Sequence, residues 1–257
     1  VYSNADPGAT ERALKAFTDR YGVKTDFQRL TGAALAQRFT AEYETNNNLT
    51  DLFISSDPIY PLDAIKKGWL TRAADLPSMT DWPKNGYLDG LVPINVNPYV
   101  LAWNSQLIPN GLKSFEELND PKWRGKVMVG DPRVLASARN WYVAIAQKFG
   151  DNFLRELGKH VTYSPSVVPG MQQVASGAQA IYAPTILLSA LDIISKGAPV
   201  KYATVDPIVI SQSVASVPAK APHPNAGRLL LSWWMSREGQ EVYSKGGYSL
   251  LPNVPGT

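Results

Sequence analysis

The stretch that decides the fold of this 257-residue chain reads Pro222-His223-Pro224-Asn225-Ala226-Gly227-Arg228, then Leu229-Leu230-Leu231-Ser232-Trp233-Trp234-Met235-Ser236, then Arg237-Glu238-Gly239-Gln240. Proline is tolerated in a first helical turn because its missing N–H would have no intrahelical partner there. The spacing of Leu229, Leu230, Trp233 and Trp234 predicts one broad apolar helix face. A second helix is predicted to begin at Ser236 and to end before Gly246-Gly247. The stretch therefore predicts a buried helical hairpin near the carboxyl end.

Length and composition indicate a globular protein of about two domains. The chain is 44% hydrophobic and 18% charged, which is ordinary for globular proteins. None of its apolar runs approaches the roughly 18 residues that a membrane span needs. Cysteine is absent, which excludes thiol nucleophiles, cysteine-ligated metals and disulfides.

The net charge of +3 is too small to indicate nucleic-acid binding. Residues 105–205 hold 11 Lys/Arg against 7 Asp/Glu, whereas the rest of the chain holds 14 against 15. A mildly positive domain favours anionic small molecules through its field. Scattered charge on a solvated surface explains the same counts equally well.

The first hundred residues alternate short strands with amphipathic helices, an order that predicts a parallel sheet covered by helices. The expected elements are a strand at Val1-Tyr2-Ser3, a turn at Asp6-Pro7-Gly8, a helix from Thr10 to Tyr21, a strand from Val23 to Leu30, a helix marked by Leu35, Phe39 and Tyr43, a strand at Leu52-Phe53-Ile54 and a helix marked by Ile59, Leu62 and Ile65.

The middle of the chain continues the alternation after a strand over residues 99–104. The expected elements are a strand at Val127-Met128-Val129, helices from Ser137 to Phe149 and from Gly170 to Ser176, a strand at Ile181-Tyr182-Ala183, a helix from Ile186 to Ser195 and a long strand from Ile208 to Val217.

Two segments carry a resemblance to a known family. The C-terminal stretch resembles the "pHPnAa…fl.w..s.eGQ" segment of solute-binding proteins of bacterial ABC importers, in the branch that includes ferric-ion-binding proteins. The segment from Asp120 to Val127 resembles the "dPkwkGkv" opening of the second lobe in that family. The resemblance implies an α/β, two-lobed periplasmic-binding-protein fold of type II, with mixed, mainly parallel sheets joined by two hinge strands.

The resemblance also implies a domain division. We expect one discontinuous lobe at residues 1–100 plus 215–257, a second lobe at 105–205, and hinge strands at about 100–104 and 205–215. The implied function is capture of a small anionic solute, a carboxylate or an oxyanion, by hinge closure and its delivery to a membrane permease. The implied protein is periplasmic and monomeric, has no enzymatic activity or cofactor, and does not insert into the membrane. Because Val1-Tyr2-Ser3 is already typical of a strand, we expect a mature or trimmed chain without its signal peptide.

Ligands of open parallel α/β sheets gather beyond the carboxyl ends of the strands, where helix N-termini present unpaired N–H groups. Applied to this chain, that rule selects polar and helix-starting residues in the loops after the strands. The candidate solute-binding residues are Ser3, Asn4, Thr31, Gly32, Ser55, Ser56, Arg133, Ser137, Ala138, Arg139, Tyr163 and Thr185. Several of them, Ser3, Thr31 and Ser56 among them, are equally typical of turns and helix caps.

Ferric ion is the alternative solute. Many ferric-binding relatives carry two adjacent tyrosines in the second lobe, whereas the matching stretch here reads Tyr182-Ala183-Pro184-Thr185-Ile186 and the chain has no Tyr-Tyr pair. The two histidines, His160 and His223, are far apart in sequence, and His223 belongs to a helix start. The sequence therefore predicts no metal site, and ferric transport is the weaker hypothesis.

Two other classes of protein remain as alternatives. An α/β hydrolase or transferase finds little support, because the chain lacks a Gly-x-Ser-x-Gly elbow, a Gly-x-Gly-x-x-Gly loop and a P-loop. A ligand-sensing domain of a receptor would share the two-lobed fold, and its cellular compartment would distinguish it.

Overall fold

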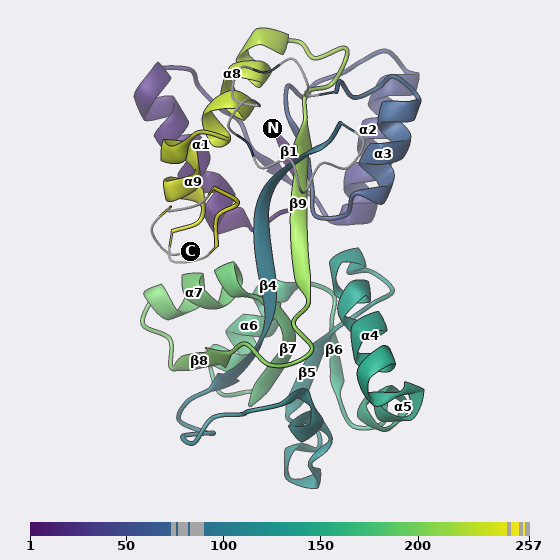
Figure 1. Cartoon of the computed structure of the whole chain (residues 1–257), viewed down its shortest axis with the longest axis vertical. Coiled ribbons are helices and arrows are strands. Elements are labelled where there is room, and N and C mark those ends of the chain that lie inside the picture. The colour runs from purple at the N-terminus through teal and green to yellow at the C-terminus, as the bar shows by residue number, and fades with distance from the viewer. Residues whose placement is uncertain (73–75, 77–81, 83–89, 246–247, 252–253, 255–257) are drawn as a thin grey trace. The chain divides into compact units, whose positions relative to one another are not determined.

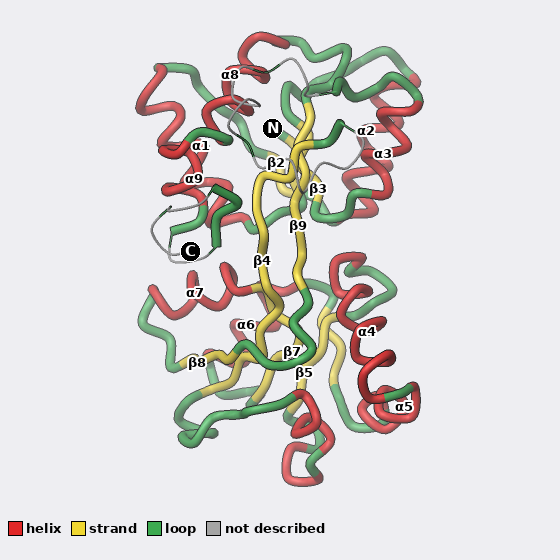
Figure 2. The backbone as a smooth tube through the Cα atoms, viewed as in Figure 1, coloured by secondary structure: helices red, strands yellow, loops and turns green. Residues whose placement is uncertain are grey.

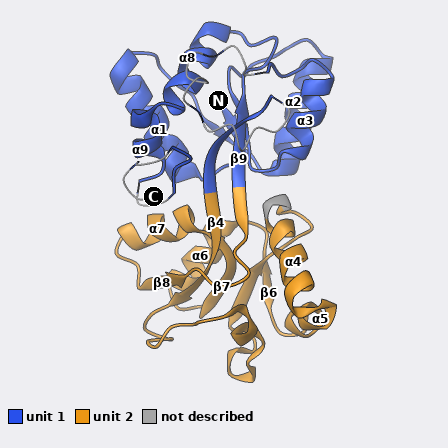
Figure 3. Cartoon of the chain, viewed as in Figure 1, with its two compact units in different colours: residues 1–96, 212–257 blue, residues 97–211 orange. Residues whose placement is uncertain are grey.

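The computed structural model describes residues 1–72, 76, 82, 90–245, 248–251 and 254, with residues 136 and 137 described by their backbone alone. The described chain forms two compact units, residues 1–96 with 212–257 and residues 97–211 (Figure 3). It passes from the first unit to the second in β4 (Val92–Asn104) and returns in β9 (Ile210–Ser216). The predicted hinge strands at 100–104 and 205–215 overlap these two strands, and hinge motion stays a prediction.

The first unit alternates strands and helices in the predicted order (Figures 1 and 2). Its elements, besides parts of β4 and β9, are β1 (Tyr2–Ser3), α1 (Pro7–Tyr21), β2 (Gln28–Arg29), α2 (Gly32–Glu44), β3 (Phe53–Ser55), α3 (Ile59–Lys66), α8 (Pro224–Trp234) and α9 (Arg237–Tyr243). Strands β2, β1 and β3 are parallel neighbours, and β9 pairs with β3 in the antiparallel direction. Since α1, α2 and α3 each follow a strand directly, their N-termini lie at the carboxyl edge of these strands.

Helices cover both faces of this sheet (Figure 1). On one face, Leu35 and Phe39 of α2 and Ile65 of α3 pack with Tyr2 and Phe53 of the strands. On the other, α1 packs against α8 and α9, where the rings of Phe17 and Trp233 lie 5.7 Å apart. The two apolar faces explain why β1 and β3 are buried, whereas the edge strand β2 is not.

The second unit holds its own mixed sheet. Its elements are the rest of β4, the short 3-10 helices η4 (Phe115–Asn119) and η5 (Pro121–Trp123), then β5 (Val127–Gly130), α4 (Ala136–Phe149), α5 (Asp151–Gly158), β6 (Thr162–Ser164), α6 (Val167–Ala175), β7 (Ile181–Ile186), α7 (Leu187–Ser195) and β8 (Val200–Ala203). Strand β5 lies between its parallel neighbours β6 and β7, and β4 pairs antiparallel with both β7 and β8. The α/β fold with mixed sheets is confirmed.

Successive side chains of a strand point to opposite faces of the sheet, so the core of the second unit is divided between the two faces of its sheet. Val127, Val129 and Ile181 pack with Trp141 of α4. Met128 and Tyr182, which point the other way, pack with residues of α6 and α7 such as Met171 and Leu187. The unit is therefore a three-layer sandwich of helices, sheet and helices.

Several expected elements differ from the structure at their ends. Asp6-Pro7-Gly8 is not a separate turn, because Pro7 begins α1 and the Asp6 side chain accepts a hydrogen bond from the N–H of Ala9. The strand expected from Val23 to Leu30 shrinks to Gln28–Arg29, the only part that pairs with β1. Helix α5 and the short strands β6 and β8 were not among the expected elements.

The C-terminal hairpin is confirmed, with one change in its buried face. Pro224 begins α8, and the Ser236 hydroxyl caps α9 by accepting from the N–H of Gly239 at 3.2 Å. Leu229 is 39% exposed, whereas Leu231 is buried. The buried face of α8 thus follows Gly227, Leu230, Leu231 and Trp234, at helical spacings of three, four and seven, together with Trp233.

Candidate functional site

The loops at the carboxyl edge of the first unit bring together three predicted residues. The side-chain oxygen of Asn4 accepts a hydrogen bond from the backbone N–H of Ser56 at 2.7 Å. The amide nitrogen of Asn4 lies toward Gly32, since a Cβ atom at that glycine would come within 3.2 Å of it. Residues after β1, β2 and β3 therefore meet at one place, as the strand-end rule predicts.

Two of the predicted hydroxyls of this edge shape its loops. The buried Ser3 hydroxyl accepts from the N–H of Ala5 at 3.0 Å. The Ser55 hydroxyl donates to the carbonyl of Asp57 at 2.7 Å and accepts from its N–H at 3.1 Å. Thr31 differs, because it is exposed at the start of α2 and its side chain makes no capping hydrogen bond.

The carboxyl edge of the second unit gathers three helix N-termini. Helices α4, α6 and α7 follow β5, β6 and β7, and the residues that precede them, Leu135, Ser166 and Ile186, make no side-chain capping bond. Their first-turn N–H groups and the positive ends of the helix dipoles suit an anion. The sequence analysis missed the start of α6, which Ser164-Pro165-Ser166 before the apolar spacing of Val167, Met171 and Val174 could have signalled.

Arg133 does not present an uncompensated charge at this edge. Its guanidinium forms two short hydrogen bonds with the Asp131 carboxylate, Nε to Oδ1 at 2.9 Å and Nη2 to Oδ2 at 2.7 Å. It also lies over the ring of Tyr163, 5.9 Å from the centroid. The Tyr163 hydroxyl is directed toward Gly158 at the end of α5. Arg133 and Tyr163 thus lie along the edge strand β6, and the charge of Arg133 is offset by Asp131.

Arg139 has a different environment. Its Nε donates to the carbonyl of Pro132 at 3.0 Å, which holds this exposed side chain back toward the loop that starts α4. Among the described residues, no carboxylate forms an ion pair with it. Arg139 is therefore a cation held beside a helix N-terminus, an arrangement suited to a carboxylate or an oxyanion.

The other predicted residues of this edge lie as follows. Ala138 is buried and packs against Gly130. Thr185 is fully buried at the end of β7, and its hydroxyl has no hydrogen-bond partner among the described residues. The side chain of Ser137 lies outside the described residues.

The Asp131–Arg133 pair predicts a pH dependence. The hydrogen bond from Arg133 holds the pKa of Asp131 below its ordinary value of 3.8. Since the pKa is lowered in the folded state, the pair stabilises the fold above pH 3.8 and loses this effect as the pH falls through the folded-state pKa. We expect Arg133→Gln to raise the pKa of Asp131 toward 3.8 in an NMR titration of the carboxyl carbon. Arg139→Gln is the control and should leave that pKa unchanged. An equal pKa in wild type and Arg133→Gln would show that the pair does not form in solution.

The phenols of Tyr142 and Tyr182 in the second unit are poor candidates for metal ligands. Burial raises the pKa of Tyr182, and it also raises the pKa of Tyr142, whose hydroxyl donates to the carbonyl of Gly130 at 2.7 Å. A tyrosine that binds ferric ion must do so as a phenolate, which these two environments disfavour. Among the described residues, His, Asp and Glu side chains form no group of three that could hold a metal ion.

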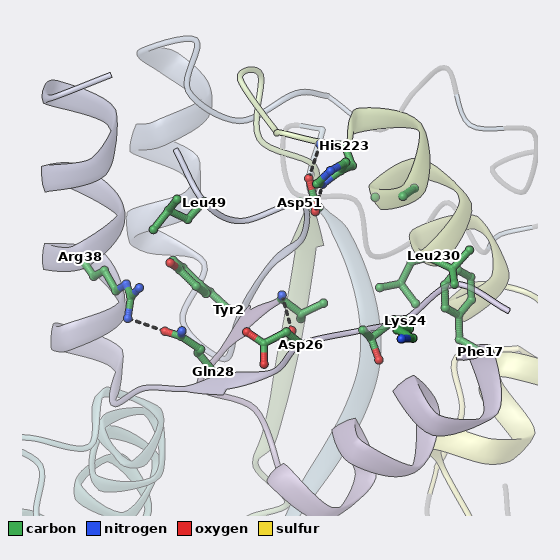
Figure 4. A pocket seen from close by; sticks show the side chains of 15 residues that line it. Tyr2, Phe17, Lys24, Asp26, Gln28, Arg38, Leu49, Asp51, His223 and Leu230 are labelled. Atoms are coloured by element: carbon green, nitrogen blue, oxygen red, sulfur yellow. Dashed lines mark hydrogen bonds and ion pairs between the residues drawn. The ribbon is translucent and has the colours of Figure 1, made fainter. Parts of the chain in front are cut away.

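A pocket of about 360 Å³ lies in the first unit at the amino ends of the strands (Figure 4). One wall comes from Lys24, Thr25 and Asp26 before β2, and another from Leu49 and Asp51 before β3. Above Asp51, the His223 ring forms a hydrogen bond with its carboxylate at 3.1 Å. The pocket lies at the amino end of β1, whereas Asn4 follows the carboxyl end of that strand. It is therefore not part of the predicted solute site.

Comparisons with known structures show the fold. The substrate-binding protein of an ABC transporter from Agrobacterium tumefaciens superposes with a TM-score of 0.88 at 18% identity, covering 99% of this chain and 80% of that one. Iron-bound HitA from Pseudomonas aeruginosa gives 0.78 at 17% identity, covering 98% and 86%. AfuA from Actinobacillus pleuropneumoniae, with fructose-6-phosphate bound, gives 0.80 at 21% identity, covering 95% and 81%.

Comparisons of sequence give the family. A Haemophilus influenzae protein of uncharacterized function is 27% identical over 97% of this chain and 76% of its own length. The family model for bacterial extracellular solute-binding proteins matches residues 1–249. The C-terminal helical hairpin, the two α/β units and this match agree, and the chain belongs to the bacterial extracellular solute-binding proteins.

Proposed function

We propose that this protein captures a small anion, a carboxylate or an oxyanion, and delivers it to the permease of an ABC importer. The family establishes solute binding for transport, and the second unit supplies the argument for an anion. Arg139 carries that argument, because its guanidinium, which forms no ion pair among the described residues, is held at the start of α4, where the residue before the helix makes no side-chain capping bond. A cation and a helix dipole acting together favour a negative group more than either does alone.

The twelve predicted side chains contribute unequally to this proposal. In the second unit, Arg139 and the backbone N–H of Ser137 bind the anionic group, while the N–H of Ala138 donates to the carbonyl of Leu135 and Arg133 stays paired with Asp131. In the first unit, Asn4, Thr31, Gly32 and Ser56 offer polar contacts, and Ser3 and Ser55 hold the loops in place.

Capture by hinge closure is the mechanism that we propose. The chain crosses between its two units only in β4 and β9 within the part that the structure describes, so bending in these strands would move one unit as a body. A solute that contacts both units would favour the closed state by its differential affinity. The closed form would then dock on the permease.

We propose a periplasmic location and a monomeric state, and we propose no enzymatic role. The family is extracellular. No helix in the described ranges has the length and apolar character to cross a membrane. Among the structural neighbours, AfuA with its sugar phosphate fits the proposed class of solute, whereas HitA with its iron does not.

A thermal-shift screen tests the proposal. We expect carboxylates or phosphate esters present at 100 to 1,000 times their dissociation constant to stabilise the protein by about 2.7–4 kcal/mol, with no shift from ferric ion. Arg139→Gln should weaken binding of the same compound at least tenfold. The matched control is Arg155→Gln on α5, which is exposed and remote from the N-terminus of α4. A shift with ferric ion alone, or equal binding by both variants, would contradict the proposal.

A further inference from the structure

The strand by which the chain leaves the first unit is held there by side-chain hydrogen bonds. Strand β4 covers residues 92–104, and the first unit ends at Val96 within it. The amide nitrogen of Gln240 on α9 donates to the carbonyl of Ile94 at 2.9 Å. Both residues are buried, and a hydrogen bond is stronger in such surroundings than in water. Strand β4 is therefore tied to α9 just before it leaves the unit.

Asn95 adds two more hydrogen bonds at the next position of β4. Its side-chain oxygen accepts from the backbone N–H of Ser213 on β9 at 2.7 Å, and its amide nitrogen donates to the Tyr243 hydroxyl of α9 at 2.9 Å. A backbone N–H can only donate, so the atom that faces Ser213 is the carboxamide oxygen and the orientation of the group is fixed. Asn95, which is 1% exposed, thus holds β4, β9 and α9 together.

Asn97 has a different environment. It lies two residues after Asn95 and so on the same face of the strand, and it is similarly buried. No residue in the described part of the chain forms a hydrogen bond with its side-chain oxygen. The next residue, Pro98, has no N–H to donate. In the second unit, the N–H of Tyr99 donates to the carbonyl of Val209 at 2.8 Å. The side-chain bonds that tie β4 to α9 therefore lie before the boundary between the units, at residues 94 and 95.

We infer that Asn95 and Gln240 form the fixed end of the hinge, so that β4 bends in residues 96–98. This inference rests on the hinge closure proposed above and locates it within β4. It also gives α9 a part in solute capture, although α9 contributes none of the predicted solute-binding residues. Loosening this anchor lets the bend extend further into the first unit, which widens the range of distances between the two units. The balance between open and closed states then changes with no change in the solute contacts.

Distances between two spin labels, one in each unit, test the inference. The chain contains no cysteine, so Glu11→Cys on α1 and Gln147→Cys on α4 provide two labelling positions, both exposed. Pulsed electron–electron double resonance then gives the distribution of distances between the labels in the whole chain. No solute is added, so the result does not depend on which solute the protein binds. The proposed solute class is tested separately by the thermal-shift screen, and the two can fail independently.

Tyr243→Phe removes the hydroxyl that accepts from Asn95 and keeps the buried ring. We expect this variant to give a wider distribution of distances than wild type. The matched control is Tyr60→Phe, which removes a hydroxyl that forms a hydrogen bond with Thr40 at 2.8 Å between α3 and α2 of the same unit. It should leave the distribution unchanged. Gln240→Leu, which removes the other bond from α9 to β4, should widen the distribution too, so the test does not depend on one variant.

Native-state hydrogen exchange gives a second readout of the anchor. The amide of Ser213 donates to Asn95, so we expect it to exchange about fivefold faster in Tyr243→Phe than in wild type, the effect of losing one hydrogen bond. Its exchange in Tyr60→Phe should match wild type. An unchanged distance distribution in Tyr243→Phe would overturn the inference at any exchange rate, because the anchor would then not control the bend. Equal widening in Tyr60→Phe would also overturn it, because the change would then reflect a general loss of stability.

Discussion

Gly227→Ala should destabilise the first unit by about 2–3 kcal/mol, the cost typical of forcing extra atoms into a packed core. A Cβ atom at Gly227 would lie 2.2 Å from the carbonyl oxygen of Asp51 and 3.1 Å from its carbonyl carbon. These are backbone atoms, so a side-chain rotation cannot relieve the clash. Hydrogen bonds from His223 to the Asp51 carboxylate fix this segment at the start of α8. Helix α8 must therefore move away from the segment to admit one methyl group.

Urea unfolding followed by tryptophan fluorescence measures the effect, because Trp233 and Trp234 lie on α8. Gly158→Ala at the end of α5 is the matched control. A Cβ atom there would meet only the hydroxyl end of Tyr163, at 3.3 Å, which can move aside. Gly227→Ala with the same midpoint as wild type would show that α8 packs against the Asp51 segment less closely than the structure has it.

The C-terminal stretch from Pro222 to Gln240 shows what hydrophobic periodicity can and cannot predict. The sequence indicates a helix starting at a proline, and α8 does start at Pro224. It does not indicate which of two overlapping apolar stripes faces the sheet. Leu229 and Leu231 are chemically equivalent, and Leu231 is buried because Gly227, four residues earlier, allows the helix to approach Asp51. That approach is a tertiary contact between residues far apart in sequence.

Strand ends were harder to predict than helices for a similar reason. Residues 23–27 are as apolar and alternating as many strands, yet only Gln28–Arg29 pairs with β1. Which residues pair depends on the position of the neighbouring strand, and the local sequence carries no information about that position. At Asp6-Pro7-Gly8 the sequence suits both a turn and a capped helix start, and packing of α1 against α9 favours the helix.

The strand-end rule found the right loops but not the roles within them. It placed Asn4, Gly32 and Ser56 at one edge although they come from three separate loops, and the structure brings them together. It could not distinguish Arg133 from Arg139, because both follow β5 within nine residues. A carboxylate two residues before Arg133 neutralises it, whereas Arg139 turns back to the carbonyl of Pro132. Side-chain pairing of this kind depends on loop conformation.

Gln240→Leu is the second substitution that should have a large effect, at roughly 2–4 kcal/mol, since each buried polar group left without a partner costs about 1–3 kcal/mol. The Gln240 side chain is fully buried. Its amide nitrogen donates to the carbonyls of Ile94 at 2.9 Å and Trp234 at 3.0 Å, and its oxygen accepts from the Ser249 hydroxyl at 2.9 Å. Leucine fills similar space but removes the side-chain donor from both carbonyls and the acceptor from Ser249. The side chain thus joins β4, the end of α8 and the C-terminal segment through hydrogen bonds rather than through its volume.

Gln240→Glu distinguishes that explanation from simple packing, because it preserves shape and changes only the donor. At neutral pH the introduced carboxylate would face two carbonyl oxygens in a buried place, so its folded-state pKa should be raised above the ordinary value near 4.3. For a carboxyl group whose pKa is raised by folding, the penalty is absent below the unfolded-state pKa and grows as the pH rises toward the folded-state pKa. We therefore expect Gln240→Glu to lose stability between about pH 4 and pH 7 relative to wild type, whereas the deficit of Gln240→Leu should stay constant. Equal stability of Gln240→Leu and wild type, together with a Gln240→Glu stability that does not change with pH relative to wild type, would mean that hydrogen bonds at this position contribute nothing beyond packing.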